Sequence, residues 1–340
     1  MPSAEGMIKL DAMENPYPLP ETLLASWLEM LQSVALNRYP DANGTVLKER
    51  IRQTMAIPDD VEMLLGNGSD ELIQLLILAV HRPGQCILAA EPSFSMYRMI
   101  ARYVGINYVG VPLRGDDFSL DLAAMYKAIC LHRPAVVFLA YPNNPTGNLY
   151  PRDQLHMIVQ GSPGIVVVDE AYCSFAREAF LSRLSDYPNL LILRTLSKMG
   201  LAGVRLGMLF GAGAWLEQLD KIRLPYNINV LSQVTAEFAL RHYDVFRAQA
   251  EQIKRDRDAV LSELAGMSGV VVYPSEANFF LLKILNDRVA QVYEGLLSRN
   301  ILVKNLHGSH PLLKGCLRIT VGTPEENAAL LAGLREILDG

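Results

Sequence analysis

Hydrophobic and polar positions divide the chain into alternating strand-like and helix-like segments. Between residues 86 and 210, short apolar runs alternate with longer stretches of helical spacing. Most of the short runs are continuous Val, Ile and Leu, without the in–out alternation of a half-buried strand. This pattern is typical of a parallel sheet that helices cover on both faces. The strands are expected near residues 86–89, 108–111, 136–140, 165–168, 190–193 and 206–210.

The two ends of the chain show different patterns. The first 20 residues are rich in Pro and Asn, and they predict an extended arm, not an element of secondary structure. After a long helical stretch at 231–264, strands and helices alternate again, which predicts a smaller α+β unit that the arm joins. The remaining helices are expected at 21–35, 45–56, 70–81, 286–299 and from 324, and the remaining strands at 270–273, 278–283, 301–303 and 317–321.

These patterns predict an α/β fold in three parts. Residues 1–35 form the arm and part of a small domain, residues 36–245 a large domain with the parallel sheet, and residues 246–340 the small C-terminal domain. A chain of 340 residues that is 50% hydrophobic can bury such a core without disulfides.

Charge and composition narrow the class of protein. The net charge is −5, which gives no electrostatic reason to expect a nucleic acid or an anionic membrane as partner. Four scattered cysteines without a CxxC motif favour reduced thiols. The N-terminus lacks the pattern of a signal peptide, and no apolar run is long enough to span a bilayer. We therefore expect a soluble cytoplasmic enzyme.

A single lysine stands in a hydroxyl-rich turn between the last two apolar runs of the central region. Residues 194–207 read RTLSKMGLAGVRLG and contain Lys198 and Arg205. An amine at the carboxyl end of a strand can form a Schiff base with a carbonyl cofactor. Thr195, Ser197 and Arg205 can hold a phosphate beside it, Arg205 through a bidentate grip.

Polar residues follow other predicted strands too. The sequences EPSF at 91–94, YPNNPTG at 141–147 and DEAY at 169–172 each come directly after an apolar run. Sites in parallel sheets form where the carboxyl ends of strands meet. A glycine loop, LGNGSDEL, precedes the helix expected at 70–81; it lacks the third glycine of a dinucleotide-binding loop. We interpret it as a capped helix start whose N–H groups, at Ser69 and Asp70, bind an anion.

Together these groups match the needs of pyridoxal phosphate. Lys198 would form the Schiff base and later act as a base, and Asp169 would keep the ring nitrogen protonated. Tyr172 and Asn144 would donate to the phenolate oxygen, and Phe94 would stack on the ring. Each residue alone has an ordinary structural explanation as a surface lysine, a cap, a turn residue or a core aromatic. The interpretation depends on all of them following successive strands.

The same motifs resemble those of class I/II aminotransferases of fold type I. The resemblance covers residues 8–325 and includes NPTG at 144–147, DEAY at 169–172, SK at 197–198 and LRIT at 317–320. It implies a large domain with a mostly parallel seven-stranded sheet sandwiched by helices, and a smaller α+β domain. Within the family the chain is most similar to the histidinol-phosphate aminotransferases, on stretches such as IKLDAMENPYP at 8–18 and NRYPD at 37–41.

That resemblance implies further roles and partners. The substrates would be histidinol phosphate and 2-oxoglutarate, in a ping-pong cycle through pyridoxamine phosphate. Ser69, Asp70, Ser197 and Arg205 would hold the cofactor phosphate. Tyr39 would reach the phosphate in the neighbouring subunit, so that the active form is a homodimer. Tyr17, Asn144, Arg318 and Lys304 would contact the substrate, although the family often has arginine where Lys304 stands, and a lysine is a point charge and not a fork.

Two questions stay open at the level of sequence. His307 and His310 lie in one loop, and without carboxylate or thiol companions they do not predict a metal site; a place near the substrate phosphate is the alternative. The alternative functions are an aromatic-amino-acid aminotransferase and a threonine-phosphate decarboxylase, a lyase. A non-catalytic protein that kept the fold is disfavoured because the lysine and the aspartate are both present.

Overall fold

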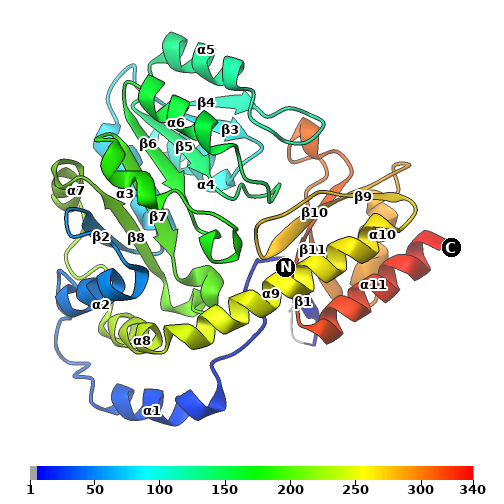
Figure 1. The fold of residues 1–340 in the computed structure, drawn as a ribbon, viewed down its shortest axis with the longest axis horizontal. Coiled ribbons are helices and arrows are strands. Elements are labelled where there is room, and N and C mark those ends of the chain that lie inside the picture. Colours follow the sequence, from blue (N-terminus) through cyan, green and yellow to red (C-terminus); the bar gives the residue numbers. More distant parts are fainter. Residues whose placement is uncertain (1–5, 340) are drawn as a thin grey trace.

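The computed structural model describes residues 6–339 and contains two β-sheets (Figure 1). The larger sheet has seven strands in the order β2-β8-β7-β6-β5-β3-β4. Strand β8 runs antiparallel to both of its neighbours, and the other adjacent pairs are parallel. The mostly parallel seven-stranded sheet is therefore confirmed. Its strands are β2 (Glu62–Asn67), β3 (Cys86–Glu91), β4 (Asn107–Pro112), β5 (Val136–Ala140), β6 (Ile165–Asp169), β7 (Leu190–Thr195) and β8 (Leu206–Gly211).

Strand β2 is the one member of this sheet that the apolar pattern did not predict. Its sequence, EMLLGN, is short and leads directly into the glycine loop, so it looked like the entry to a helix. Antiparallel pairing with β8 over six residues makes it an edge strand. Only the tertiary pairing distinguishes it from an irregular segment.

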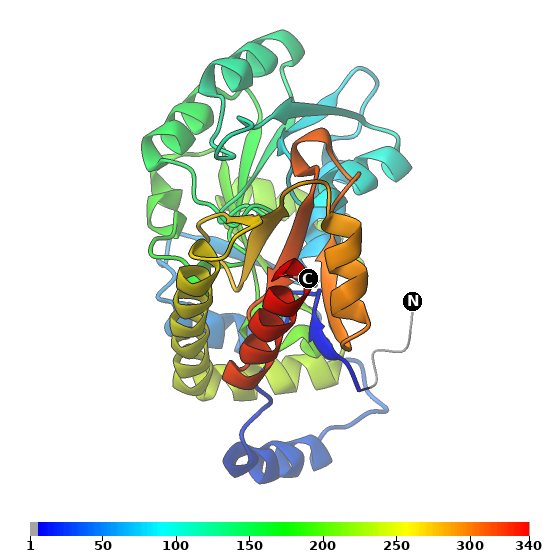
Figure 2. The same ribbon diagram turned by 90° about the vertical axis from the view of Figure 1, so that its right-hand side faces the viewer.

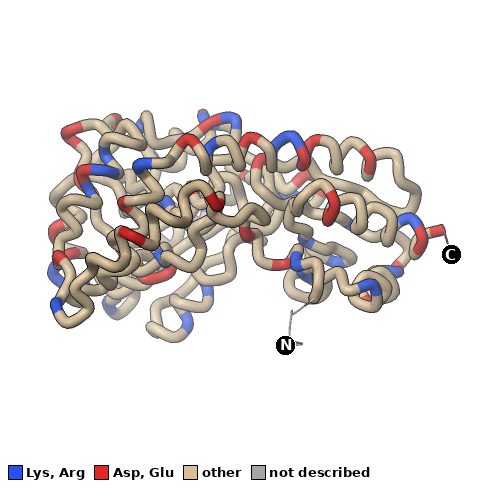
Figure 3. The backbone as a smooth tube through the Cα atoms, turned by 90° about the horizontal axis from the view of Figure 1, so that it is seen from below, with Lys and Arg blue, Asp and Glu red and all other residues tan. Residues whose placement is uncertain are grey.

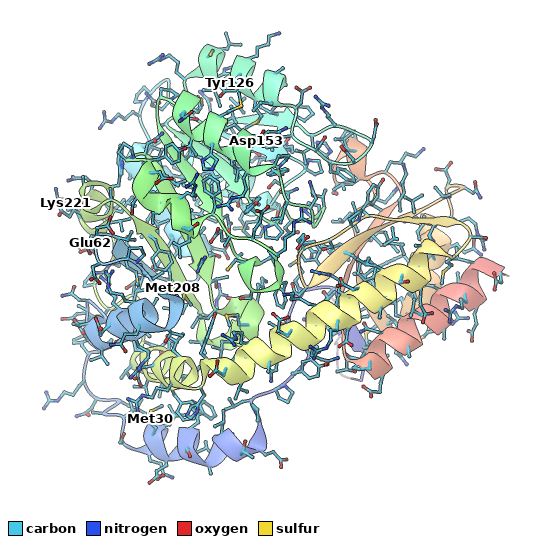
Figure 4. The ribbon with its side chains drawn as sticks, viewed as in Figure 1. Met30, Glu62, Tyr126, Asp153, Met208 and Lys221 are labelled. Atoms are coloured by element: carbon cyan, nitrogen blue, oxygen red, sulfur yellow. The ribbon has the colours of Figure 1, made fainter. Side chains whose placement is uncertain are left out.

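Helices cover both faces of the large sheet, as the continuous apolar runs indicated. One face packs against α3 (Ser69–Val80), α4 (Ser95–Val104) and α7 (Gly213–Asp220), and the other against α2 (Thr45–Met55), α5 (Leu122–His132), α6 (Arg152–Gly161) and α8 (Val230–Arg241). Since successive strand residues point to opposite faces, the neighbours Ile87 and Leu88 belong to different core clusters. Side chains fill the space between these layers (Figure 4).

The smaller sheet has five strands in the order β1-β11-β12-β10-β9 and packs against three helices. The N-terminal arm joins it, as expected, but residues 8–10 are a true strand, β1 (Ile8–Leu10), and not an irregular segment. Figure 2 shows β1 beside the C-terminal elements. The other elements are β9 (Val270–Val272), β10 (Phe279–Ile284), β11 (Ile301–Asn305), β12 (Cys316–Thr320), α9 (Tyr243–Ala265), α10 (Val289–Leu297) and α11 (Pro324–Asp339).

Two predicted helices differ in detail. The stretch expected at 231–264 is broken at His242 into α8 and α9. Helix α1 (Glu21–Gln32) has no buried residue and is attached mainly to α8, where Trp27 Nε1 donates to Thr235 Oγ1 at 3.1 Å. It lies apart from both sheets in Figures 1 and 2. The domain boundaries at 35 and 245 stay a prediction.

The surface carries both signs of charge. Acidic and basic residues are interspersed along the chain in Figure 3. Among residues 6–339, no helix has the length and apolar character that crossing a membrane requires.

Candidate functional site

A cavity of about 240 Å³ lies at the carboxyl ends of β5, β6 and β7. These strands are parallel neighbours, so the residues that follow them meet at one edge of the sheet. The N-terminal segment and the start of α3 complete the walls. The lining residues are Ala12, Glu14, Ser69, Asp70, Phe94, Ala140, Pro142, Asn144, Asp169, Ala171, Tyr172, Thr195, Ser197, Lys198, Ala202 and Arg205. Ten of the predicted site residues are therefore brought together.

Lys198 lies in the short 3-10 helix η3 (Ser197–Met199), directly after β7. Burial, and then the positive charge of Arg318, lower the pKa of its amine from 10.5 to about 8. Its Nζ lies 5.7 Å from the centre of the Tyr172 ring. An amine with this pKa has a substantial unprotonated fraction near neutral pH, which a nucleophile or a base requires.

Asp169 ends β6 at the floor of the cavity and is almost completely buried. Its Oδ1 accepts the backbone N–H of Ala171 at 3.1 Å, and its Oδ2 accepts the hydroxyl of Tyr97 at 2.6 Å. Burial raises the pKa of the carboxyl from 3.8 to about 6, although the Tyr97 hydrogen bond acts in the opposite direction. Asp169 is thus a partly desolvated anion above pH 6, and a cation beside it would be stabilised.

Tyr97 was missed by the sequence reasoning. It lies on α4, is fully buried, and its ring stacks on Phe138 with 4.6 Å between the ring centres. Burial, and then the Asp169 carboxylate that its hydroxyl faces, raise the pKa of Tyr97 well above its usual value. The only available signal was its place three residues after Phe94, on the same side of the helix.

Tyr172, Asn144 and Arg318 form a buried polar row above the floor. Asn144 Nδ2 donates to the Tyr172 hydroxyl at 3.0 Å, and Arg318 Nη1 donates to Asn144 Oδ1 at 2.7 Å. Arg318 does not line the cavity itself; its Nη2 donates to the carbonyl oxygen of Asp11, and its Nε has no hydrogen-bond partner among the described residues. The Nε donor of this guanidinium is therefore available to a ligand.

The start of α3 and the end of the lysine loop form an anion cup. Gly68 precedes α3 with a φ of +84°. No side chain accepts a hydrogen bond from the first N–H groups of α3, so these groups at the edge of the cavity are available to an anion. Arg205 Nη2 lies 3.8 Å from Asp70 Oδ2. A Cβ added to Gly207 would lie 2.6 Å from the backbone nitrogen of Ser69, so only glycine permits this close approach of β8 to the cup.

Thr195, Ser197 and Phe94 occupy the remaining walls. Thr195 Oγ1 lies 2.9 Å from Ser197 Oγ and 3.0 Å from the carbonyl oxygen of Leu206, so its hydroxyl is engaged in holding the turn. Ser197 Oγ has no other hydrogen-bond partner among residues 6–339, and Ser197 lines the cavity. Phe94 stands just before α4 with its ring edge-on to Tyr97, at 5.6 Å between ring centres.

Besides Arg318, five residues singled out by the sequence do not line this cavity. Tyr17 Oη donates to Asp256 Oδ2 at 3.3 Å, and Lys304 is exposed on β11, where it pairs in register with Arg318. Tyr39 is 80% exposed and stacks on Tyr226. The remaining two, His307 and His310, lie in the segment between β11 and β12.

His307 and His310 hold their own loop together. His307 Nδ1 accepts the backbone N–H of Gly315 at 3.0 Å, and His310 Nδ1 accepts that of Leu312 at 3.2 Å. Within residues 6–339 no cluster of three His, Cys, Asp or Glu side chains has the arrangement of a metal site. A place for these two residues near the substrate phosphate stays a prediction.

The fold and the site define a class of enzyme. A strand-end lysine of lowered pKa, a buried carboxylate and an anion cup in one cavity are the parts of a carbonyl-cofactor enzyme. The chain matches the family "Aminotransferase class I and II" over residues 5–334, and it belongs to that family.

Individual relatives are more specific. The chain is 53% identical to "Histidinol-phosphate aminotransferase 2" of Nitrosococcus oceani, over 98% of this chain and 92% of the relative. In structure it is similar to the histidinol-phosphate aminotransferase of Sinorhizobium meliloti in complex with pyridoxal-5'-phosphate, with a TM-score of 0.88 at 24% identity, covering 98% and 91% of the two chains. The L-threonine-O-3-phosphate decarboxylase of Porphyromonas gingivalis is also similar, with a TM-score of 0.83 at 22% identity over 98% of this chain and 100% of that one. The fold alone therefore does not separate transferase from lyase.

Proposed function

We propose that this protein is a pyridoxal-phosphate-dependent aminotransferase that transfers the amino group of L-histidinol phosphate to 2-oxoglutarate. The observation that carries the proposal is the meeting of Lys198 and Asp169 in one cavity, each with a pKa shifted toward neutrality by burial. The name of the Nitrosococcus oceani relative, at 53% identity over nearly the whole chain, supports the substrate.

The residues present fit the cofactor. The cup at Ser69 and Arg205 offers N–H groups and a cation to a phosphate, and a side chain at Gly207 would collide with the backbone that forms it. Asp169 lines the same cavity and is buried, and Phe94 stands at its wall. The polar atom Asp70 Oδ1 is buried without a partner in the described structure, which is consistent with a site that a polar ligand completes.

Pyridoxal phosphate supplies an aldehyde that condenses with amines and a protonated ring that accepts the electron pair left at Cα. Lys198 Nζ would hold the cofactor covalently and, once released, remove the proton from Cα of the amino substrate. Asp169 would hold the proton on the ring nitrogen through its negative charge, and Tyr97 would keep that carboxylate oriented.

Tyr172 and Asn144 would orient the ring from its other edge. Their mutual hydrogen bond fixes the Tyr172 hydroxyl, whose pKa is raised by burial, so it stays a donor at neutral pH. Arg318, through its free Nε and its bond to Asn144, would connect substrate binding with this row. Tyr17 and Lys304 would contact the substrate from the arm and from β11.

The enzyme would act as a homodimer in the cytoplasm, with Tyr39 crossing to the neighbouring cavity. Support comes from an exposed apolar patch formed by Leu36, Tyr39, Leu224 and Tyr226, on two loops joined by a hydrogen bond from Arg223 Nη1 to the carbonyl oxygen of Ala42. Mixing the inactive variants Tyr39→Ala and Lys198→Ala tests this arrangement. Random heterodimers would each contain one intact site and restore about a quarter of wild-type activity; no restoration would place Tyr39 outside the partner's site.

The visible absorbance spectrum of the purified protein tests the function as a whole. Adding histidinol phosphate without an oxo acid should convert the visible band of the bound cofactor into the near-ultraviolet band of its amine form, and 2-oxoglutarate should reverse the change. Conversion by phenylalanine alone would move the function to an aromatic-amino-acid aminotransferase. Release of carbon dioxide from threonine phosphate would make it a lyase. A protein that shows no band after addition of pyridoxal phosphate would contradict the proposal.

A further inference from the structure

The N-terminal segment Asp11–Asn15 crosses from the small sheet to the lysine loop and forms one wall of the cavity. It begins directly after β1, and both Ala12 and Glu14 line the cavity. At its first residue the carbonyl oxygen of Asp11 accepts Arg318 Nη2 at 2.8 Å. The segment therefore contacts the substrate side of the site before it reaches Lys198.

The middle of the segment is fixed to the small domain by its backbone. Met13 N–H donates to Thr320 Oγ1 at 2.9 Å, and Asn278 Nδ2 donates to the carbonyl oxygen of Met13 at 3.0 Å. Met13 is buried with a φ of +56°, a conformation that a side-chain-bearing residue adopts rarely. These contacts hold the backbone at Met13 in this uncommon conformation.

The last residue of the segment, Asn15, is bonded to the loop that carries Lys198. Asn15 Nδ2 donates to the carbonyl oxygen of Met199 and to Gln249 Oε1, both at 3.1 Å, and its Oδ1 accepts the N–H of Tyr17 at 2.8 Å. Met199 is the residue after Lys198 and ends η3. All the hydrogen-bonding capacity of one amide NH2 is thus directed at the lysine loop and its neighbour α9.

The lysine loop is shaped to receive this amide. Gly200, which follows Met199, has a φ of +107°, and a Cβ added to it would lie 3.1 Å from Asn15 Nδ2. Helix η3 has a single turn, so few of its own backbone bonds define the orientation of the peptide after Lys198. The bond from Asn15 supplies one of the missing constraints.

We propose that Asn15 is a positioning residue for Lys198: by donating to the carbonyl oxygen of Met199, it sets the direction from which the lysine amine enters the cavity. The inference rests on the proposed function. Because Asn15 belongs to the segment that also contacts Arg318, it links the placement of the lysine to the substrate side of the site. Asn15 itself touches neither substrate nor cofactor in this role.

The test uses the full-length enzyme with pyridoxal phosphate and three variants. Asn15→Asp keeps the shape and the acceptor for Tyr17 but replaces the donor by a second acceptor that faces the Met199 carbonyl. Asn15→Ser keeps a short polar group and loses the reach to Met199; it remains informative if Asn15→Asp folds poorly. Gln249→Ala is the matched control, because it removes the other partner of Asn15 and leaves the Met199 bond intact.

We expect both Asn15 variants to lower kcat about 5- to 30-fold, the loss of one hydrogen bond, with the KM for the amino substrate changed by less than about threefold. The pH midpoint of the visible cofactor band should move, and the apoenzyme should regain that band more slowly. Gln249→Ala should stay within about threefold of wild type in all three measurements. A merely structural role would lower thermal stability without moving the midpoint.

Two results would overturn the proposal. One is a wild-type midpoint and kcat in both Asn15 variants. The other is equal impairment of Gln249→Ala, which would show that anchoring of the arm, and not the bond to Met199, matters. Failure of the proposed function would look different, because the wild-type protein itself would then lack the band or the transamination.

Discussion

The two sides of the cavity are built in different ways. On the floor, Asp169 and Lys198 each stand within a few residues of the end of a parallel strand. On the opposite side, contacts join residues far apart in sequence: Met13 and Thr320, which share a hydrogen bond, are 307 positions apart. The floor follows from the topology of one sheet, whereas the opposite wall exists only after the two sheets have packed together.

The two sides also differ in electrostatics. The floor contains ionisable groups whose pKa values are moved by burial, downward for Lys198 and upward for Asp169. On the opposite side, the backbone carbonyls of Asp11 and Met13 accept hydrogen bonds from Arg318 and Asn278, and Asn15 donates across to the lysine loop. Reactive groups therefore lie at the edge of the large sheet, and hydrogen bonds from the other side orient them. Substitutions on the floor should change chemistry, and those on the opposite wall should change binding and orientation.

The largest effect is expected from Lys198→Ala. Loss of the nucleophile and base should lower kcat by about 10⁴-fold or more while leaving a folded protein, because the side chain is not part of a core cluster. Single-turnover kinetics measures the loss of the chemical step, and circular dichroism measures whether the variant is folded. Normal turnover in this variant would remove Lys198 from the chemistry.

Asp169→Asn should have the next largest effect. The amide keeps an acceptor for Tyr97 but loses the charge, so the proton on the ring nitrogen is no longer stabilised and kcat should fall about 10²- to 10³-fold. Tyr97→Phe is the matched comparison, since it removes only the hydrogen bond to the carboxylate. Its effect should be smaller than that of Asp169→Asn; an unchanged rate in Asp169→Asn would exclude the ionic role.

Arg318→Lys tests whether the two sides of the cavity act independently. Lysine lacks the planar fork with which Arg318 donates to Asn144 and Asp11, so kcat/KM for histidinol phosphate should fall about 10- to 100-fold, while the spectrum of the bound cofactor stays close to wild type. Steady-state kinetics and absorbance on the same preparation test this. Loss of the cofactor band would show that the two sides are not independent.

The apoenzyme should become more stable when Asp169 is neutral. A raised folded-state pKa means that the contribution of this carboxyl to stability is complete below its unfolded pKa of 3.8 and is lost as the pH rises through about 6. Apo Asp169→Asn should therefore exceed apo wild type by about 1–3 kcal/mol at pH 7.5, with no difference below pH 4. Urea unfolding at both pH values measures it; an equal or lower stability of the variant at pH 7.5 would contradict the buried-charge argument.

The smallest effect is expected from Lys304→Ala. This lysine is exposed on β11 and has no salt bridge within the described residues, so its removal should lower kcat/KM for histidinol phosphate by no more than about threefold. Repeating the measurement at high salt serves as the control, since screening should abolish a long-range effect. A loss above tenfold would show that the Lys304 ammonium meets the substrate phosphate in a desolvated site and not as a screened, solvent-exposed charge.

The sequence predicts more of the site on one side of the cavity than on the other. The apolar runs at 136–140, 165–168 and 190–193 predicted strands of one parallel sheet and, at their carboxyl ends, the meeting of Asn144, Asp169 and Lys198. They did not reveal Tyr97, because a tyrosine on an amphipathic helix looks like any core aromatic until the helix is placed beside β6. They did not reveal Asn15 either, since the residues around it carry no periodicity.

The sequence by itself determined the elements, the mostly parallel sheet and the reactive groups at its edge. Strand periodicity and strand polarity are local properties, and the carboxyl ends of parallel strands must lie together. The tertiary structure decided the edge strand β2, the break at His242, the addition of β1 to the small sheet and the contact of Asn15 with Met199. Each of these depends on a partner many residues away, and the energy of such a contact is realised only when the two surfaces pack.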